Sequence, residues 1–229
     1  MTSSGFGHQN QTAPGDQIVL WDFDGTLADT LSSSVSIYNE LATQHGFRTI
    51  SDPSTLRDLT TSEIMQLLGI PIWKLPGLAR RFMARQKHVI QHVPLFPGIE
   101  HVLRTLRNSG VVLGIVSSNS DESIRLCLRA NNVEQYFDEI VGYARLFGKH
   151  LALRKTMAQR SVLPRQILYI GDEVRDIEAA ARVSVEVAAV TWGWHSSSLL
   201  SSQRPTYLIN EASEILDMPR FRSLRAGPD

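Results

Sequence analysis

Two aspartates separated by one residue lie near the start of this sequence. Asp22 and Asp24 end the short apolar run 17–22 and precede Gly25. In extended backbone, residues two apart point to the same side, so both carboxylates face one crevice. Adjacent carboxylates raise each other's pKa unless a cation lies between them. The alternative is a polar junction between a strand and a turn, and the pair alone does not decide between the two.

Two further sites for an anion follow along the chain. Ser117, Ser118 and Asn119 come after the apolar run 111–116, and their hydroxyl and backbone N–H groups can hold a phosphate. The same residue types also cap helices. Lys149 begins a predicted helix, where its charge is unfavourable unless an anion lies nearby. A solvated surface lysine is the alternative.

A cluster of acidic residues follows the apolar run 167–170. Asp172 and Asp176 are four residues apart, with Glu173 between them. Oxygen ligands of this kind suit Mg²⁺. Acidic residues at the start of a helix are also favourable by themselves, which explains Glu173 and Asp176 better than Asp172. Taken together, the motifs bring five acids and one lysine to one place, and this set requires a cation and a doubly negative ligand.

The elements that position these motifs alternate between strands and helices. Apolar runs predict strands at 17–22, 111–116, 167–170 and 185–190, with a weaker edge strand at 206–209. Amphipathic patterns predict helices from 99 to the closing Gly110, and at 121–130, 149–160 and 174–182. This order predicts an α/β fold with a Rossmann-like, doubly wound parallel sheet.

One long region breaks the alternation. Residues 29–93 contain only helical patterns, and a connection of this length is far longer than usual. We therefore expect an inserted helical domain that returns through the turn-rich segment 94–98. The predicted organisation is a disordered leader (1–16), a core (17–28 and 94–217), the helical insertion (29–93) and a tail (218–229).

Composition restricts the class of protein. The chain has 229 residues, with 23 basic and 23 acidic side chains, so binding to nucleic acid through bulk charge is not expected. A single cysteine, Cys127, excludes an intramolecular disulfide and argues against a cysteine-based zinc site. No apolar run approaches the roughly 18 residues of a membrane span, and no secretory signal is visible. We expect a cytoplasmic protein without a membrane partner, either monomer or homodimer.

The sequence resembles the haloacid dehalogenase superfamily of phosphohydrolases from Gln17 to Leu216. The residues that carry the resemblance are the motif 22–27 (DFDGTL), Ser117, Lys149 and the acidic motif 171–176. The helical insertion resembles the C1-type cap of that family. The segments 97–98 (PG), 136–142 (YFDEIVG) and 176–180 (DIEAA) resemble its phosphoglycolate-phosphatase-like branch.

The resemblance implies hydrolysis of a small phosphate monoester. Asp22 would be the nucleophile that forms an aspartyl phosphate, and Asp24 the acid and base. Ser117 and Lys149 would bind the phosphoryl group. The remaining implied roles are phosphate binding by Asp24, Gly25, Ser118 and Asn119; Mg²⁺ binding by Asp22, Asp172 and the backbone carbonyl of Asp24; and indirect support of the metal by Glu173 and Asp176.

Two departures from the family pattern stand out. His150 follows Lys149, where many relatives have a small residue or proline, and Glu173 follows Asp172, where several have serine or aspartate. The second departure could shift metal binding towards Glu173.

Alternative functions remain open. A phosphosugar mutase would use the same aspartates, and a phospho-accepting or binding module would use Asp22, Mg²⁺ and Lys149 without turnover. Haloacid dehalogenation is disfavoured, because that reaction needs neither a metal nor Asp24. His195 and Cys127 are more typical of structural positions. Candidates for contact with the leaving group lie in the insertion: Arg48, Arg57, Trp73, Lys74, Arg80 and Arg81.

Overall fold

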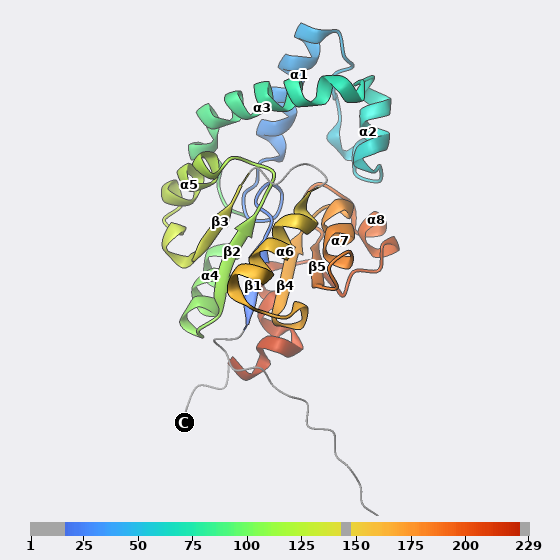
Figure 1. The fold of residues 1–229 in the computed structure, drawn as a ribbon. Helices are drawn as coiled ribbons and strands as arrows, with labels where there is room; N and C mark the ends of the chain where they lie inside the picture. The colour runs from blue at the N-terminus through green and yellow to red at the C-terminus, as the bar shows by residue number, and fades with distance from the viewer. Residues whose placement is uncertain (1–16, 143–147, 225–229) are drawn as a thin grey trace, which may run out of the picture.

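The computed structural model describes residues 17–142 and 148–224. Its centre is a sheet of six parallel strands in the order β3-β2-β1-β4-β5-β6 (Figure 1). This confirms the predicted doubly wound parallel α/β fold. The strands are β1 (Ile18–Trp21), β2 (Val112–Val116), β3 (Glu139–Val141), β4 (Ile167–Gly171), β5 (Glu186–Val190) and β6 (Tyr207–Ile209).

The register places the ends of the three central strands at the same level. Trp21 of β1 pairs with Ile115 of β2 and with Ile170 of β4. Because all three strands run the same way, the residues that follow them meet at one edge of the sheet. Asp22, the segment from Ser117 and the segment from Asp172 therefore lie together.

Alternate residues of β1 supply two separate cores. Val19 and Trp21 pack into one cluster, with side chains of α4 (Ile99–Asn108) and α5 (Asp121–Ala130). Ile18 and Leu20 pack into the other, with side chains of α6 (Lys149–Arg160), α7 (Val174–Ala181) and α8 (Ser197–Ser202). Since every side chain of β1 is buried, the strand is a continuous apolar run rather than an alternating one.

The elements between β1 and α4 are all helical, as predicted. Figure 1 shows the inserted helices α1, α2 and α3 grouped at one end of the sheet. They have a small apolar core of their own, formed by Ile50, Leu56, Ile64 and Leu68. The elements of the insertion are α1 (Leu31–His45), η2 (Pro53–Leu56), α2 (Thr61–Leu68), η3 (Ile72–Lys74), α3 (Leu75–Val89) and η4 (Ile90–His92).

The ordered core extends beyond its predicted boundary at 217. The short helices η7 (Ala212–Asp217) and η8 (Pro219–Leu224) follow β6. Met218 and Phe221 are 3% and 1% exposed and belong to the larger core cluster. The expected leader (1–16) and the last residues of the expected tail (225–229) lie outside the described part of the chain. Within that part, no helix combines the length and apolarity needed to cross a membrane.

Candidate active site

A tight loop holds the two aspartates at the end of β1. The N–H of Asp22 donates to the carbonyl of Ile170 in β4 (2.8 Å), so the sheet pairing continues to this residue. The N–H of Ala28 donates back to the carbonyl of Phe23 (3.0 Å), and the Phe23 side chain is fully buried. The chain therefore reverses immediately after Asp24. Asp22 becomes buried while Asp24 stays half-buried at the edge.

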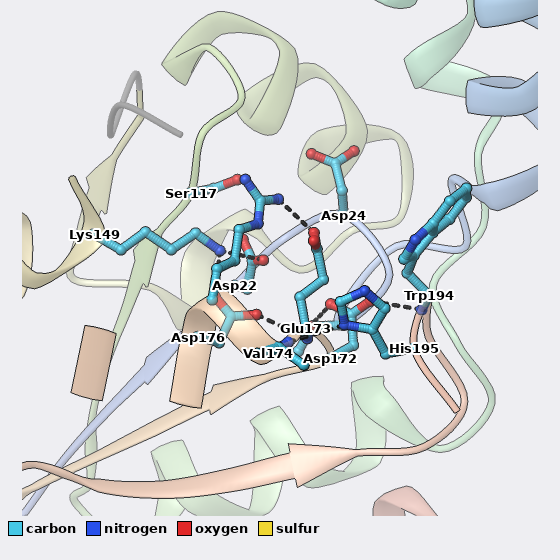
Figure 2. Close-up of polar contacts among 12 residues, drawn as sticks. Asp22, Asp24, Ser117, Lys149, Asp172, Glu173, Val174, Asp176, Trp194 and His195 are labelled. Carbon is cyan, nitrogen blue, oxygen red and sulfur yellow. Dashed lines mark hydrogen bonds and ion pairs between the residues drawn. The ribbon is translucent and has the colours of Figure 1, made fainter. Parts of the chain in front are cut away.

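Lys149 lies between two buried carboxylates (Figure 2). Its Nζ is 2.5 Å from Asp22 Oδ2 and 2.6 Å from Asp176 Oδ1, and all three side chains are at most 2% exposed. Asp176 also accepts hydrogen bonds from the Tyr169 hydroxyl (3.3 Å) and from the N–H of Glu173 (3.0 Å). Asp176 thus has protein donors at both oxygens and fixes the position of Lys149. This excludes the solvated surface lysine considered above.

The local charges explain the shifted pKa values. Burial raises the pKa of Asp22 to about 6, although Lys149 opposes this. Burial, followed by the negative charges of Glu173 and Asp22, raises the pKa of Asp172 well above its usual value. Burial alone would lower the pKa of Lys149, but Asp176 and Asp22 outweigh that effect and keep the lysine charged. The site therefore contains more negative charge than its own cations neutralise.

Three of these carboxylates could share a metal ion. Asp22, Asp172 and Asp176 offer oxygen atoms within 4.8 Å of one another, and all three are buried. Hard oxygen donors suit a small divalent cation, which would also relieve the unbalanced charge at Asp22 and Asp172. The residues therefore fit the predicted metal site, with Asp176 closer to it than expected.

Asp172 is held rigidly by its neighbours. Its Oδ1 accepts from the Thr26 hydroxyl (2.8 Å), and its Oδ2 accepts from the N–H of Trp194 (2.7 Å). A Cβ atom added at Gly25 or at Gly193 would lie 2.3 Å from the same Oδ2. Only glycine leaves room for the carboxylate at these two positions.

Asp24 faces two amide side chains. Gln86 Nε2 donates to Asp24 Oδ1 (2.8 Å), and Asn119 Nδ2 donates to Asp24 Oδ2 (3.0 Å). Burial raises the pKa of Asp24, and hydrogen bonds from Asn119, Thr30 and Gln86 partly offset this increase. Gln86 comes from α3, so one of the groups that hold Asp24 belongs to the insertion.

The polar residues that follow β2 take different places. Ser117 is fully buried, and its hydroxyl accepts from the N–H of Asn119 (3.2 Å). Figure 2 shows Ser117 on the same side of the site as Lys149, and Ser118 lines the neighbouring cavity. Ser120 provides the cap of α5. Helix capping therefore does not account for Ser117 and Ser118.

A cavity of about 200 Å³ opens between the sheet edge and the inserted helices. Arg175 contributes a cation to its wall. One Arg175 nitrogen pairs with Glu173, while Nε and Nη1 are buried without a hydrogen-bond partner in the described structure. These N–H groups can donate hydrogen bonds to the oxygens of an anion. The lining residues are Asp24, Gly25, Thr30, Leu31, Ser34, Phe82, Gln86, Ser118, Asp172, Glu173, Arg175 and Trp194.

The structure does not bring the predicted leaving-group contacts to this cavity. Arg57 instead donates to the carbonyls of Thr191 (2.9 Å) and His195 (3.4 Å), and so joins the insertion to the core. Trp73 is 77% exposed. The candidates that do not line the cavity are Arg48, Arg57, Trp73, Lys74, Arg80 and Arg81. The residues of the insertion that do line it are smaller or uncharged, and charge alone was a poor guide.

His195 and Cys127 occupy structural positions. His195 is fully buried, and its Nδ1 accepts from the N–H of Val174 (2.9 Å). Burial lowers the pKa of His195, which favours its neutral form. Burial also raises the pKa of Cys127 to about 12, so its thiol stays protonated.

Sequence reasoning missed four residues of the site. Arg175 had a visible signal, since it is a cation inside an acidic motif, and Thr26 lies within the motif at 22–27. Gln86 and Trp194 had none, because tertiary packing alone brings an amide of α3 and a loop N–H to the two carboxylates.

Comparison with known proteins agrees with this geometry. Residues 19–190 match the family described as haloacid dehalogenase-like hydrolase. The chain is 32% identical to a phosphoglycolate phosphatase of Synechococcus elongatus over 87% of this chain and 95% of the relative. It is 27% identical to the tyrosine-protein kinase PtkA of Mycobacterium tuberculosis, over 88% of this chain and 72% of the relative.

Solved structures share the fold. A haloacid dehalogenase-like family protein of Streptococcus pneumoniae superposes with a TM-score of 0.75 at 20% identity, over 89% of this chain and 98% of that chain. The family match spans most of the core as well as the insertion. The chain therefore belongs to the haloacid dehalogenase-like hydrolases, and within them it is similar to the phosphoglycolate phosphatases.

Proposed function

We propose that the protein hydrolyses small phosphate monoesters with Mg²⁺, and that Asp22 carries the phosphoryl group during the reaction. The main support is the buried contact between Lys149 Nζ and Asp22 Oδ2 (2.5 Å), beside a cavity that Asp24 lines. A carboxylate nucleophile needs no base, but it must approach an anion, and a buried cation reduces that repulsion. Similarity to a phosphoglycolate phosphatase makes phosphoglycolate the first substrate to test.

In the first half of the proposed reaction, an oxygen of Asp22 attacks phosphorus, and the bond between phosphorus and the ester oxygen breaks. Protonated Asp24 gives its proton to that oxygen, which leaves as an alcohol. Lys149 and Ser117 hold the phosphoryl oxygens, and the N–H groups of Arg175 offer further donors.

In the second half, ionised Asp24 accepts a proton from water. The water oxygen bonds to phosphorus, the bond to Asp22 breaks, and phosphate leaves with the Asp22 carboxylate restored. The surroundings of Asp24 suit both halves. Burial favours its protonated form, and the amides of Gln86 and Asn119 favour its ionised form.

Asp22, Asp172 and the backbone carbonyl of Asp24 would hold Mg²⁺. When bound, the ion supplies positive charge that offsets the charge of the phosphate. Asp176 holds Lys149 in place through Oδ1, and Glu173 is paired with Arg175. We assign both residues to indirect support of the metal.

A phosphate-release assay tests the proposal. The panel contains phosphoglycolate, glucose 6-phosphate, AMP, pyridoxal phosphate and 4-nitrophenyl phosphate, each with Mg²⁺ or with EDTA. The variants are Asp22→Asn and, as a matched control, Asp29→Asn, which changes an exposed carboxylate in the same loop region. We expect release that requires both Mg²⁺ and Asp22 and that persists in Asp29→Asn.

Other outcomes favour the other functions. Conversion of a sugar phosphate into its isomer without release would indicate a mutase. A stable phosphorylated protein without turnover would indicate a phospho-accepting module. Release by Asp22→Asn at the wild-type rate would contradict the assigned nucleophile.

A further inference from the structure

Gln86 is an unusual residue for its helix. It is the one fully buried residue of α3, at 2% exposed, although the helix has fifteen residues. A buried polar side chain needs hydrogen-bond partners, since its desolvation is otherwise costly. Gln86 finds both partners across the boundary between the insertion and the core, in Asp24 and Asn119.

A chain of hydrogen bonds fixes the orientation of both amides. The N–H of Ser120 donates to Asn119 Oδ1 (2.8 Å), so Asn119 presents its NH₂ group to the site. Asn119 Nδ2 donates to Gln86 Oε1 (3.0 Å), and this leaves Gln86 Nε2 to face Asp24 Oδ1 at 2.8 Å. Because a carbonyl oxygen cannot donate, neither amide can be reversed without losing these contacts.

The two amides make their shortest contacts with Asp24 at different carboxylate oxygens. Gln86 donates to Oδ1 of Asp24, and of the two contacts that Asn119 makes with Asp24 the shorter is to Oδ2. Asn119 belongs to the core, but Gln86 contacts Asp24 only while α3 is seated on the core. The neighbouring Lys87 Nζ lies 2.7 Å from Glu122 of α5 and supports that seating from the exposed side.

We propose that Gln86 is a positioning residue for Asp24: it aligns the carboxylate with the leaving-group oxygen when α3 is in place. The inference deepens the proposed function and rests on it. It ties proton transfer to the position of the insertion, since the alignment is incomplete without a side chain from α3. Gln86 itself exchanges no proton, because an amide is neither acid nor base near neutral pH.

The test compares two esters that differ in their need for an acid. The alkoxide released from phosphoglycolate must be protonated, whereas 4-nitrophenolate leaves readily without a proton. Gln86→Met keeps a similar volume and removes the donor. We expect kcat for phosphoglycolate to fall about 10- to 100-fold, part of the effect typical of general acid catalysis. The KM for phosphoglycolate and both constants for 4-nitrophenyl phosphate should change less than about threefold.

Two further variants complete the design. Gln86→Asn keeps an amide that is one methylene too short to reach Asp24, and it should show the same dependence on the leaving group if Gln86→Met folds poorly. His88→Gln changes an exposed residue of the same helix and should leave the hydrolysis of both esters unaffected. Thermal unfolding reports whether each variant is folded.

The outcomes separate the inference from the proposed function. Equal losses on both esters, or no loss on either, would overturn the positioning role of Gln86. If wild-type protein hydrolyses no ester of the panel, or if Asp22→Asn remains active, the proposed function itself fails. When phosphoglycolate is not a substrate, the best alkyl phosphate of the panel takes its place in the comparison.

Discussion

Removing the charge of Lys149 should strongly destabilise the metal-free protein. Lys149→Met keeps most of the side-chain volume but leaves the buried carboxylates of Asp22 and Asp176 without the cation that lies 2.5 and 2.6 Å from them. Loss of one partner from a buried ion pair typically costs about 3–5 kcal/mol. For a chain of this length, that corresponds to a fall in melting temperature of about 6–20 °C.

A double-mutant cycle shows whether the lost charge of Lys149 causes the destabilisation. Asp176→Asn removes one of the two carboxylates and retains a side chain of the same shape. If the electrostatic explanation is right, Lys149→Met combined with Asp176→Asn should cost about 1–3 kcal/mol less than the sum of the single changes. Loss of packing at Lys149 would instead give additive costs, because the Asp176 substitution leaves the volume unchanged.

The assay is urea unfolding in EDTA, so that no metal compensates for the missing lysine. Activity measured in Mg²⁺ provides a second readout, and kcat/KM for Lys149→Met should fall about 10²–10³-fold, as when a charge-stabilising donor is removed. Additive unfolding costs, or a single-variant cost below about 1 kcal/mol, would refute the view that the three charges form one unit.

Three other changes have expected outcomes. Gly25→Ala places a Cβ 2.3 Å from Asp172 Oδ2 at a φ of +76°; it should lower Mg²⁺ affinity in a metal titration, unlike Gly46→Ala, which has a similar φ (+71°) and open space. Burial raises the pKa of Asp22 from 3.8 to about 6, so its contribution to stability is present below pH 3.8 and lost as pH rises through about 6. Because a cation binds the ionised carboxylate, Mg²⁺ should raise the melting temperature more at pH 8 than at pH 5, and equal shifts would contradict this. Phe221→Ala should cost about 3–5 kcal/mol, because the ring is 1% exposed in the core; in urea unfolding, a cost near zero would show that the segment after 217 is dispensable.

The positions of the main elements followed from local patterns in the sequence. The predicted helices 121–130 and 149–160 match α5 and α6 at both ends, and the predicted strands differ from β1, β2, β4 and β5 by one residue or less at each end. Strand β3 (Glu139–Val141) escaped prediction. It has only three residues, all half-buried, and lacks the apolar run that identifies a central strand.

The meeting of the proposed catalytic groups of the core was predictable for a topological reason. Parallel strands end at one edge, so residues directly after β1, β2 and β4 must meet whatever the details of packing. The insertion follows no such rule. Its candidates were chosen by charge, yet Arg57 binds backbone carbonyls of the core, and an uncharged Gln86 reaches Asp24. Which face of an inserted helix meets the site depends on how the helix docks, and periodicity does not encode that.

The insertion touches the core at both walls of the cavity. At one wall, Gln86 holds Asp24. At the other, Arg57 binds the loop whose Trp194 N–H holds Asp172. A carboxylate is held in place by the groups that donate to it. A shift of the inserted helices therefore moves donors at both Asp24, the proposed acid–base group, and Asp172, a proposed metal ligand. Substitutions that reshape the insertion for a new leaving group should therefore alter turnover together with specificity, even where they touch no substrate atom.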